Sequence, residues 1–503
     1  MKILFIHPND YLNIGIPTGI ATLSAILKKE GHKINVFDFT FIKTEEYIKP
    51  KSDESKKVGT ANKGIFLPTE YTLNDLVEKD PVQSLREAFE KKLKEFQPDL
   101  IAVSVMTGYF DRAMELLQAV KLPCKVIVGG VHATIDSEDA LSFDVVDFIC
   151  VGEGEGLFLE LCDCLEEGKD YSKIKNLGYK KNGHIYINEL RPFFNFDELP
   201  TPDWSLFDER HLFRPLMGKI YKGSFYVMSR GCPQLCTYCV NGSLRERYKG
   251  CGQYFRYQSP KTTIKHLSSL KEKFGATWFK FADDSIMLLS EEYLEELAAG
   301  LKPLNIQFGC SVRPETTTER KVEILKSMGC VTASVGVESG NEAIRKTVLN
   351  RHMSNETIKR SIVILKNAGI RVSTFNMIGL PEETRENVFE TISLNRELNV
   401  DSVNVYIVYP YPGTGINKKY NIKLRGKNGK MTPVNKASSF AFSKMPPEEV
   451  EGLLRTFDLY LKLPEEIWPV VKVAERRDKA AEELRKALAN CAINFVKNKN
   501  ANQ

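Results

Sequence analysis

The sequence predicts an α/β protein in three parts: an N-terminal doubly wound, Rossmann-like parallel sheet, a central partial (β/α)6 barrel of the TIM type, and a C-terminal helical region. Over the first two hundred residues, short apolar runs alternate with helical patterns. From Lys222 on, a strand-then-helix unit repeats about six times. We place the N-terminal domain at 1–195, a linker at 196–220, the barrel at 221–430 and a helical cap at 431–503.

The composition excludes several classes of protein. The 503 residues are 42% hydrophobic and 27% charged, and no stretch approaches the ~20 apolar residues of a membrane span. The apolar start is too short for a signal-peptide core, so we expect a cytoplasmic protein. A net charge of +5 gives no reason to expect nucleic acid or an anionic membrane as partner. Eleven cysteines indicate a reducing compartment and metal chemistry.

In the N-terminal part, apolar runs predict buried parallel strands, and residues 41–79 read as a long surface excursion. We expect strands at 2–7, 33–39, 100–106, 125–128 and 148–151, with helices at 20–29, 84–96 and 111–120. Ligands of such sheets bind at the carboxyl ends of the strands. Glycine-bearing turns lie there, at 129–130 and 152–154, where the backbone can approach a ligand closely.

The central part predicts six strands, with polar residues after each one. The first covers 225–228, and the others are expected at 278–282, 306–312, 332–337, 371–378 and 402–408. Helices are expected at 260–273, 291–301, 319–328, 355–368 and 385–398. Six units are fewer than a closed eightfold barrel needs. Amphipathic helices at 448–463 and 470–497 predict a cap over the substrate side of the barrel.

Three cysteines follow the first barrel strand on one loop. Cys232, Cys236 and Cys239 are separated by three residues and then by two, so their thiolates converge on one metal centre. An iron–sulfur cube usually has four Cys ligands, and three would leave one iron open to a small molecule. Two alternatives remain. Cys251 could complete a four-Cys zinc site in a binding module, or the thiols could be unrelated buried cysteines.

The loop Cys-x3-Cys-x-aromatic-Cys, with Tyr238 as the aromatic residue, resembles the signature of the radical S-adenosylmethionine (SAM) enzymes. The N-terminal part resembles the cobalamin-binding domain that precedes many of their barrels, as in cobalamin-dependent methyltransferases and anaerobic magnesium-protoporphyrin monomethyl ester cyclases. The matching stretches are 16–23, 129–133, 151–155 and 199–203. The resemblance implies a [4Fe–4S] cluster, SAM and cobalamin as cofactors, with the three cysteines as catalytic cluster ligands.

The resemblance also implies which barrel residues contact SAM. Acids after the second strand contact the methionine amino group, Glu338 contacts the ribose, and the turn around Gly379 contacts adenine. Arg313 could hold the carboxylate in a bidentate pair, although a structural ion pair is an equal alternative. The adjacent acids could instead cap the next helix. The SAM candidates are Tyr238, Asp283, Asp284, Arg313, Glu338, Ser339, Asn376 and Gly379.

The resemblance also implies which residues of the first domain contact cobalamin. They are Thr18, Gly19, Thr107, Gly129, Gly130, His132, Gly152, Glu153 and Gly154. The Asp-x-His-x-x-Gly stretch that places a histidine on cobalt in cobalamin mutases is absent. Neither His7 nor His132 is followed by the required glycine, so we expect no protein histidine on the lower face. A degenerate domain without cofactor remains an alternative.

These features predict hydrogen abstraction from an unactivated carbon, with C-methylation as the expected outcome. Ring formation or ring contraction, with or without cobalamin, is the alternative reaction, and a zinc-stabilised binding module is the alternative from another class. We expect a small-molecule, peptide or lipid substrate and a reductant such as flavodoxin or ferredoxin.

Overall fold

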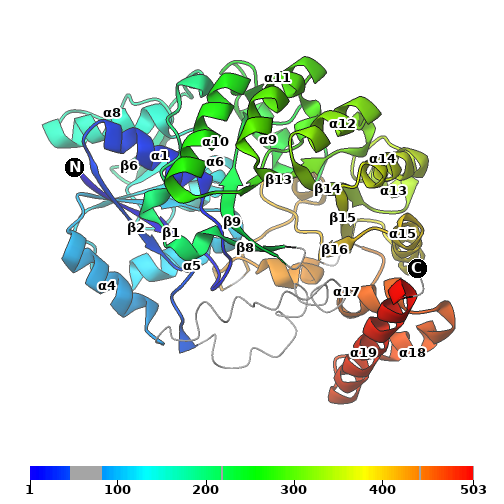
Figure 1. Ribbon diagram of the computed structural model, residues 1–503. Helices are drawn as coiled ribbons and strands as arrows, with labels where there is room; N and C mark the ends of the chain where they lie inside the picture. Colours follow the sequence, from blue (N-terminus) through cyan, green and yellow to red (C-terminus); the bar gives the residue numbers. More distant parts are fainter. Residues whose placement is uncertain (46–81, 217–218, 427, 441–442, 502–503) are drawn as a thin grey trace.

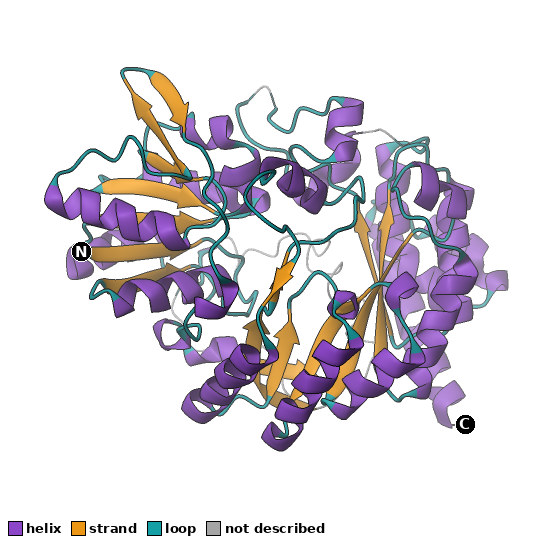
Figure 2. Ribbon diagram, turned by 90° about the horizontal axis from the view of Figure 1, so that it is seen from above, coloured by secondary structure: helices purple, strands orange, loops and turns teal. Residues whose placement is uncertain are grey.

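The computed structural model describes residues 1–45, 82–216, 219–426, 428–440 and 443–501. Two seven-stranded sheets lie side by side, with helices on both faces of the first and along the outer side of the second (Figures 1 and 2). The predicted α/β class, with a Rossmann-like sheet and a partial barrel, is confirmed. Most of the predicted excursion at 41–79 lies outside the described residues.

The first sheet has the order β2-β1-β3-β4-β5-β6-β7. Strands β1 to β5 are parallel. The chain adds β2 on one side of β1 and then crosses to the other side, where β3, β4 and β5 follow in order, so the order of the strands reverses between β1 and β3. Strands β6 and β7 form an antiparallel hairpin at the edge. The strands are β1 (Lys2–His7), β2 (Lys33–Asp38), β3 (Leu100–Ser104), β4 (Lys125–Gly129), β5 (Phe148–Cys150), β6 (Leu177–Lys181) and β7 (His184–Ile187).

Alternating side chains of the buried strands supply two separate cores. Ile3 and Phe5 of β1 pack with α1 and α8, whereas Leu4 and Ile6 pack with α4 and α5 on the opposite face. The sheet is therefore covered on both sides, as its continuous apolar strands predict. The helices are α1 (Thr18–Lys29), α4 (Leu85–Phe96), α5 (Thr107–Gln118), α6 (Val131–Ile135), α7 (Ser137–Leu141) and α8 (Glu155–Glu167).

The second sheet has the order β16-β15-β14-β13-β12-β9-β8. Six parallel strands form the predicted partial barrel, and β8 pairs antiparallel with β9 at one edge. The strands are β8 (Phe213–Leu216), β9 (Lys219–Tyr226), β12 (Trp278–Phe281), β13 (Gln307–Val312), β14 (Cys330–Glu338), β15 (Arg371–Ile378) and β16 (Ser402–Ile407).

The main barrel helices begin after hydroxyl residues that accept a backbone N–H of the first turn, which explains the accuracy of their predicted starts. These N-caps are Ser259, Ser290, Thr318, Ser354 and Thr384. The helices of this part are α9 (Val240–Arg247), α10 (Pro260–Phe274), α11 (Glu291–Leu301), α12 (Glu319–Ser327), α13 (Glu342–Thr347), α14 (Asn355–Asn367), α15 (Arg385–Leu398) and α16 (Gly415–Tyr420).

The linker is more structured than its prolines suggest. Three short 3-10 turns occupy Phe196–Glu198, Trp204–Leu206 and Glu209–Leu212, and β8 follows. Trp204 is 2% exposed and packs on Phe274 and Phe279 of the barrel. Burial of these aromatic residues fixes the predicted linker against the barrel.

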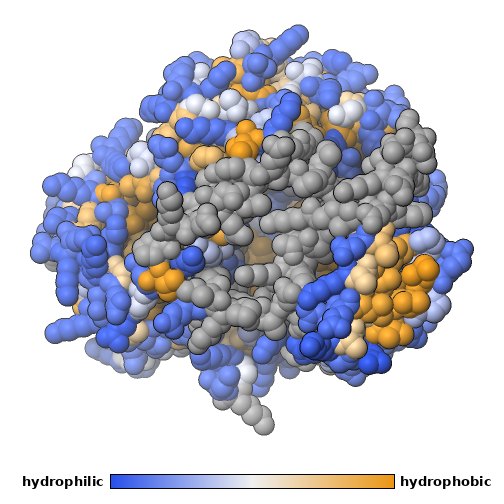
Figure 3. Space-filling model, turned by 60° about the horizontal axis from the view of Figure 1, so that its bottom comes forward, coloured by the Kyte–Doolittle hydropathy of each residue, from blue (hydrophilic) through white to orange (hydrophobic). Residues whose placement is uncertain are grey.

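The C-terminal helices α17 (Pro447–Lys462), α18 (Trp468–Val473) and α19 (Lys479–Ala501) pack beside α15 and β16 (Figure 1). The segment before them returns to the first domain, where Arg425 pairs with Asp111 and Lys430 pairs with Glu115. No helix among the described residues is long and apolar enough to cross a membrane. Most of the coloured surface in Figure 3 is hydrophilic.

Candidate functional site

The cysteine loop begins where β9 ends and runs into α9. Cys232 and Cys236 are buried, and Cys239 is half-buried. Burial raises the pKa of the Cys232 thiol to about 11, and the nearby Cys239 contributes to the rise. Arg313 Nη1 lies 3.5 Å from Cys236 Sγ, and Asn241 Nδ2 lies 3.7 Å from Cys239 Sγ. Three clustered thiols with N–H donors aimed at their sulfurs suit iron ligation.

Cys251 lies in a different environment. Its backbone bonds to Phe193 and Tyr248, and Lys175 is the charge that acts on its thiol. Cys232, Cys236 and Cys239 lie close enough for their thiols to act on one another, whereas none of them is among the groups that act on Cys251. The surroundings of Cys251 therefore set it apart from the loop cysteines.

Tyr238, inside the cysteine loop, is tied to the end of β14. Its hydroxyl donates to Glu338 Oε1 at 2.9 Å, and Arg351 Nη1 donates to the Tyr238 hydroxyl at 3.0 Å. Burial raises the pKa of Glu338, while Arg351 opposes the rise. Glu338 has a φ of 68° beside a break in the strand register, a conformation that is rare for residues other than glycine. The structure thus brings Tyr238 and Glu338 together with Arg351, which the sequence reasoning missed.

Asp283 and Asp284 fasten the cysteine loop. Asp283 Oδ1 accepts the backbone N–H groups of Met228 and Ser229 and the Ser229 hydroxyl, and burial raises the pKa of this carboxyl to about 7. Asp284 accepts from Asn241 at 2.8 Å. Both acids therefore act on the loop itself, and a contact with the SAM amino group stays a prediction.

The remaining SAM candidates lie around the ends of β14 and β15. Ser339 is fully buried, and its carbonyl accepts from Arg345. The Asn376 side chain accepts from Asn395 of α15, on the outer face of the sheet. Gly379 has a φ of +73° and lies against Val450 of α17. Their roles toward SAM stay predictions.

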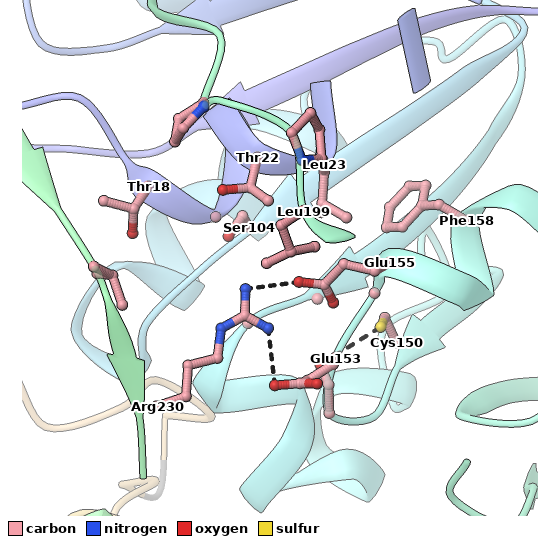
Figure 4. Close-up of a pocket in the computed structure, with 18 of the residues that line it drawn as sticks. Thr18, Thr22, Leu23, Ser104, Cys150, Glu153, Glu155, Phe158, Leu199 and Arg230 are labelled. Carbon is pink, nitrogen blue, oxygen red and sulfur yellow. Dashed lines mark hydrogen bonds and ion pairs between the residues drawn. The ribbon is translucent and has the colours of Figure 1, made fainter. Parts of the chain in front are cut away.

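A cavity of about 280 Å³ lies at the carboxyl ends of the first sheet, where the winding reverses (Figure 4). Seven of the predicted cobalamin residues line it: Thr18, Gly19, Gly129, Gly130, Gly152, Glu153 and Gly154. The linker contributes Leu199 and Pro200, and the barrel contributes Tyr226 and His266. The cavity is thus shared by all three segments.

Thr107 and His132, the other two cobalamin candidates, are not in the cavity lining. His132 is fully buried against Phe110, with its ring nitrogens 3.3 Å from Thr107 Oγ1 and 3.1 Å from Asp139 Oδ2. Arg425 also pairs with Asp139. His132 therefore supports the contact between the first domain and the segment that follows the barrel.

Arg230 joins the cavity to the cysteine loop. It lies two residues before Cys232, and its guanidinium pairs with Glu153 at 2.8 Å and with Glu155 at 2.7 Å (Figure 4). Arg256 pairs with Glu153 as well. These ion pairs were not predictable from the sequence, because the partners are far apart along the chain.

The cavity wall also contains a set of polar, uncharged side chains that the sequence analysis did not predict. The Tyr226 hydroxyl lies 2.7 Å from Gln258 Oε1 and 3.0 Å from His266 Nδ1. Burial lowers the pKa of His266 to about 4, so its ring is uncharged at neutral pH. The His266 ring is hydrogen-bonded to the Tyr226 hydroxyl and lines the barrel side of the cavity.

The fold and site define a two-domain protein with a cysteine-loop barrel and a cofactor-binding Rossmann-like sheet. The family model of the radical SAM superfamily matches residues 226–394, and that of the B12 binding domain matches residues 73–162. An uncharacterised methyltransferase of Pyrococcus horikoshii, PH0819, is 30% identical over 335 residues, covering 64% of this chain and 70% of that protein.

Other relatives extend over nearly the whole chain. The anaerobic magnesium-protoporphyrin IX monomethyl ester cyclase of Rubrivivax gelatinosus is 22% identical and covers 99% of this chain and 82% of its own length. The structure of the radical SAM methyltransferase TsrM from Kitasatospora setae, with cobalamin and a [4Fe–4S] cluster bound, shares the fold. Its TM-score is 0.65 at 14% identity, with 99% of both chains covered.

The chain belongs to the radical SAM superfamily and carries a B12 binding domain. The predicted cofactors, a [4Fe–4S] cluster, SAM and cobalamin, are confirmed by these two families. It is a radical SAM enzyme with a B12 binding domain.

Proposed function

We propose that this protein is a cobalamin-dependent radical SAM enzyme that methylates an unactivated carbon. The observation that carries the proposal is the Arg230 bridge. The residue that leads into the cysteine loop lies in the wall of the cavity and pairs with Glu153 and Glu155 of the B12 binding domain. Two cofactor sites joined in this way can act on one substrate.

In this proposal Cys232, Cys236 and Cys239 would hold the iron–sulfur cluster, and the residues at the ends of the barrel strands would hold SAM beside it. When bound, the reduced cluster and SAM supply a 5′-deoxyadenosyl radical, and cobalamin supplies the methyl group; this chemistry belongs to the cofactors. Arg313 and Arg351 put positive charge beside the Cys236 thiol and Glu338. Arg313 also pairs with Glu315, the structural ion pair that the sequence left open, so a contact between Arg313 and the carboxylate of SAM is part of the proposal.

The first-domain cavity suits part of cobalamin. Its volume of about 280 Å³ lies at the lower end of the range for small-molecule pockets, so it fits one portion of a large cofactor. Phe5, Leu23 and Phe158 give it apolar walls, while glycines let the backbone approach. His132 is engaged with Asp139, and His266 with Tyr226, so we propose that no histidine of this chain ligates cobalt.

Ring formation is the second candidate, because the Rubrivivax cyclase aligns with 99% of this chain. The two reactions use SAM differently. Methylation consumes one SAM as methyl donor, giving S-adenosylhomocysteine, and a second as radical source, giving 5′-deoxyadenosine. Ring formation gives 5′-deoxyadenosine alone. A flavodoxin or ferredoxin is the proposed reductant.

The test is anaerobic reconstitution with iron, sulfide and hydroxocobalamin, followed by counting iron and cobalt per chain. The loaded protein then receives dithionite, SAM with a deuterated methyl group, and small-molecule fractions from cells. A product that carries the deuterated methyl group, with both SAM-derived products in equal amounts, supports the proposal. Iron without cobalt, or 5′-deoxyadenosine without S-adenosylhomocysteine, contradicts methylation.

A further inference from the structure

The concave side of the barrel sheet is polar and remains partly exposed. Along β12 to β15, the side chains that point outward are buried in the core formed with the helices, such as Phe279, Cys310 and Val335. The alternate side chains, including Lys280 and Ser334, are only partly buried. Figure 2 shows helices along the outer side of this curved sheet. The concave side is therefore not a packed apolar core.

Four serines form a row across this concave side. Strand pairing sets Ser311 of β13 opposite Ser334 of β14, Ser334 opposite Ser373 of β15, and Ser373 opposite Ser402 of β16. Asn404 adds an amide that donates to Ser373 Oγ at 2.8 Å. Hydroxyl and amide groups in register offer several hydrogen bonds to one ligand.

Lys280 brings a positive charge to the serine row. It pairs in register with Gly309, and its Nζ donates to Ser334 Oγ at 3.1 Å. Because Gly309 has no side chain, the Lys280 stem can pass over β13 toward β14. Gly309 is in register with Thr332 of β14. Ser334 is the next residue of β14 that faces the concave side, and it lies nearer the carboxyl ends of the strands than Thr332 does. The ammonium therefore points up the barrel, toward the cysteine loop.

Nothing among the described residues neutralises this ammonium with a carboxylate. Its hydrogen bond goes to a neutral hydroxyl, and the groups that act on its charge are the thiols of Cys310 and Cys330. Burial lowers the pKa of Lys280, because desolvation disfavours its charged form. A bound anion at this position would favour the charged form.

The next row down contains unpaired polar atoms. Trp278 and Gln307 are neighbours in register, directly below Lys280 and Gly309. Neither Trp278 Nε1 nor Gln307 Oε1 has a hydrogen-bond partner among the described residues, although both atoms are buried. Such groups are usually satisfied by water or a ligand, which makes this floor suited to a hydrated polar group.

We propose that Lys280 and the serine row bind an anionic group of the substrate, a carboxylate or a phosphate, at the floor of the barrel. The inference rests on the proposed function, since it assigns the substrate class of the same site. Four residues of β14 separate Ser334 from Glu338, a rise of about 13 Å. In the proposed reaction Glu338 belongs to the SAM site, so the reacting carbon would lie roughly that far from the anionic group.

The wall above the serine row is aromatic. The rings of Phe375 and Tyr406 lie parallel within 12°, with centroids 6.2 Å apart, and Tyr406 is 50% exposed. A flat or apolar body between the anionic group and the reacting carbon would bury this surface. The substrate is thus an acid with an extended aromatic or apolar portion.

The test compares the reconstituted wild-type protein with Lys280→Met, which keeps the stem and removes the charge. Lys261→Met on the exposed surface of α10 is the matched control. Unfolding temperature is measured with inorganic phosphate, with acetate and with chloride at equal ionic strength. We expect the wild type and Lys261→Met to be stabilised by phosphate or acetate beyond chloride. Lys280→Met should bind the anion at least about tenfold more weakly.

The better of the two anions identifies the substrate group as phosphate or carboxylate. Should Lys280→Met fail to fold, the wild type alone suffices: trinitrobenzenesulfonate labels lysines, and mass spectrometry follows Lys280 against Lys261. Protection of Lys280 by the anion supports the proposal. The proposal is overturned if the anion shifts the unfolding temperature equally in all variants, or if it does not protect Lys280 from labelling. In that case the proposed function still stands, provided that the reconstituted protein binds iron and cobalt. Absence of iron from the reconstituted wild type overturns both.

Discussion

Replacement of Arg230 by methionine tests the bridge between the two cofactor sites. Arg230 is 28% exposed, and its partners Glu153 and Glu155 are 15% and 5% exposed. After Arg230→Met, Glu153 keeps its pair with Arg256, but Glu155 is left buried without this cation. Breaking a buried pair costs about 3–5 kcal/mol, and partial exposure of Arg230 reduces this to about 2–4 kcal/mol. Because the melting entropy of a 503-residue chain is about 1 kcal/mol per kelvin, we expect the unfolding temperature to fall by about 2–4 °C.

The assay is anaerobic calorimetry of the reconstituted protein, together with its cobalt and iron content. Arg86→Met is the matched control, because Arg86 pairs with Glu90 on the surface with 61% of its side chain exposed. Its effect should stay within about 0.5 kcal/mol. Adding Glu155→Gln to Arg230→Met should recover part of the loss, since the stranded charge is removed. Equal stability of Arg230→Met and Arg86→Met, or no recovery in the double variant, refutes the reasoning.

Three further predictions concern single positions. Burial raises the pKa of Glu383 to about 8, so between pH ~4.5 and 8 the folded chain holds a proton that the unfolded chain has released. Stability should therefore fall as pH rises through this window, by at most about 5 kcal/mol, and Glu383→Gln should flatten the unfolding-temperature profile; parallel profiles would contradict this. Gly19→Val should fill cavity space, because the nearest atom to an added Cβ is Ser104 Oγ at 4.0 Å. We expect cobalamin affinity to fall about tenfold in equilibrium dialysis with iron content retained, and unaltered cobalt binding would argue against the site. Cys236→Ala should abolish the brown absorbance of the cluster, whereas Cys251→Ala should keep it; loss in both variants would return Cys251 to the ligand set.

The cysteine spacing, the glycine turns and the strand–helix rhythm are local features, and they were predictable. The last five barrel strands lie close to their expected ranges, because apolar periodicity acts over short distances, whereas β9 begins at Lys219, well before the expected residue 225. Seven cobalamin candidates line one cavity for a related reason: parallel strands direct every following turn to the same edge of the sheet.

Side-chain partners could not be predicted in the same way. Thr107 and His132 follow strand ends, yet they contact each other, and His132 contacts Asp139, because α5 and α6 turn them away from the cavity. Asn376 ends β15 but its side chain faces α15, since alternate residues of a strand point to opposite sides. A polar residue that is displaced by one position along a strand therefore faces the opposite side of the sheet.

The sequence alone determined the class of chemistry, since three thiols on eight consecutive residues need no tertiary contact to converge. Only the tertiary structure decided how the sites are joined. Arg230 meets Glu153 across 77 residues of chain, and Arg351 meets Tyr238 across 113. The serine row likewise exists only because strand register aligns residues from four separate strands. Register and domain packing depend on the burial of whole faces, a property that no short stretch of sequence contains.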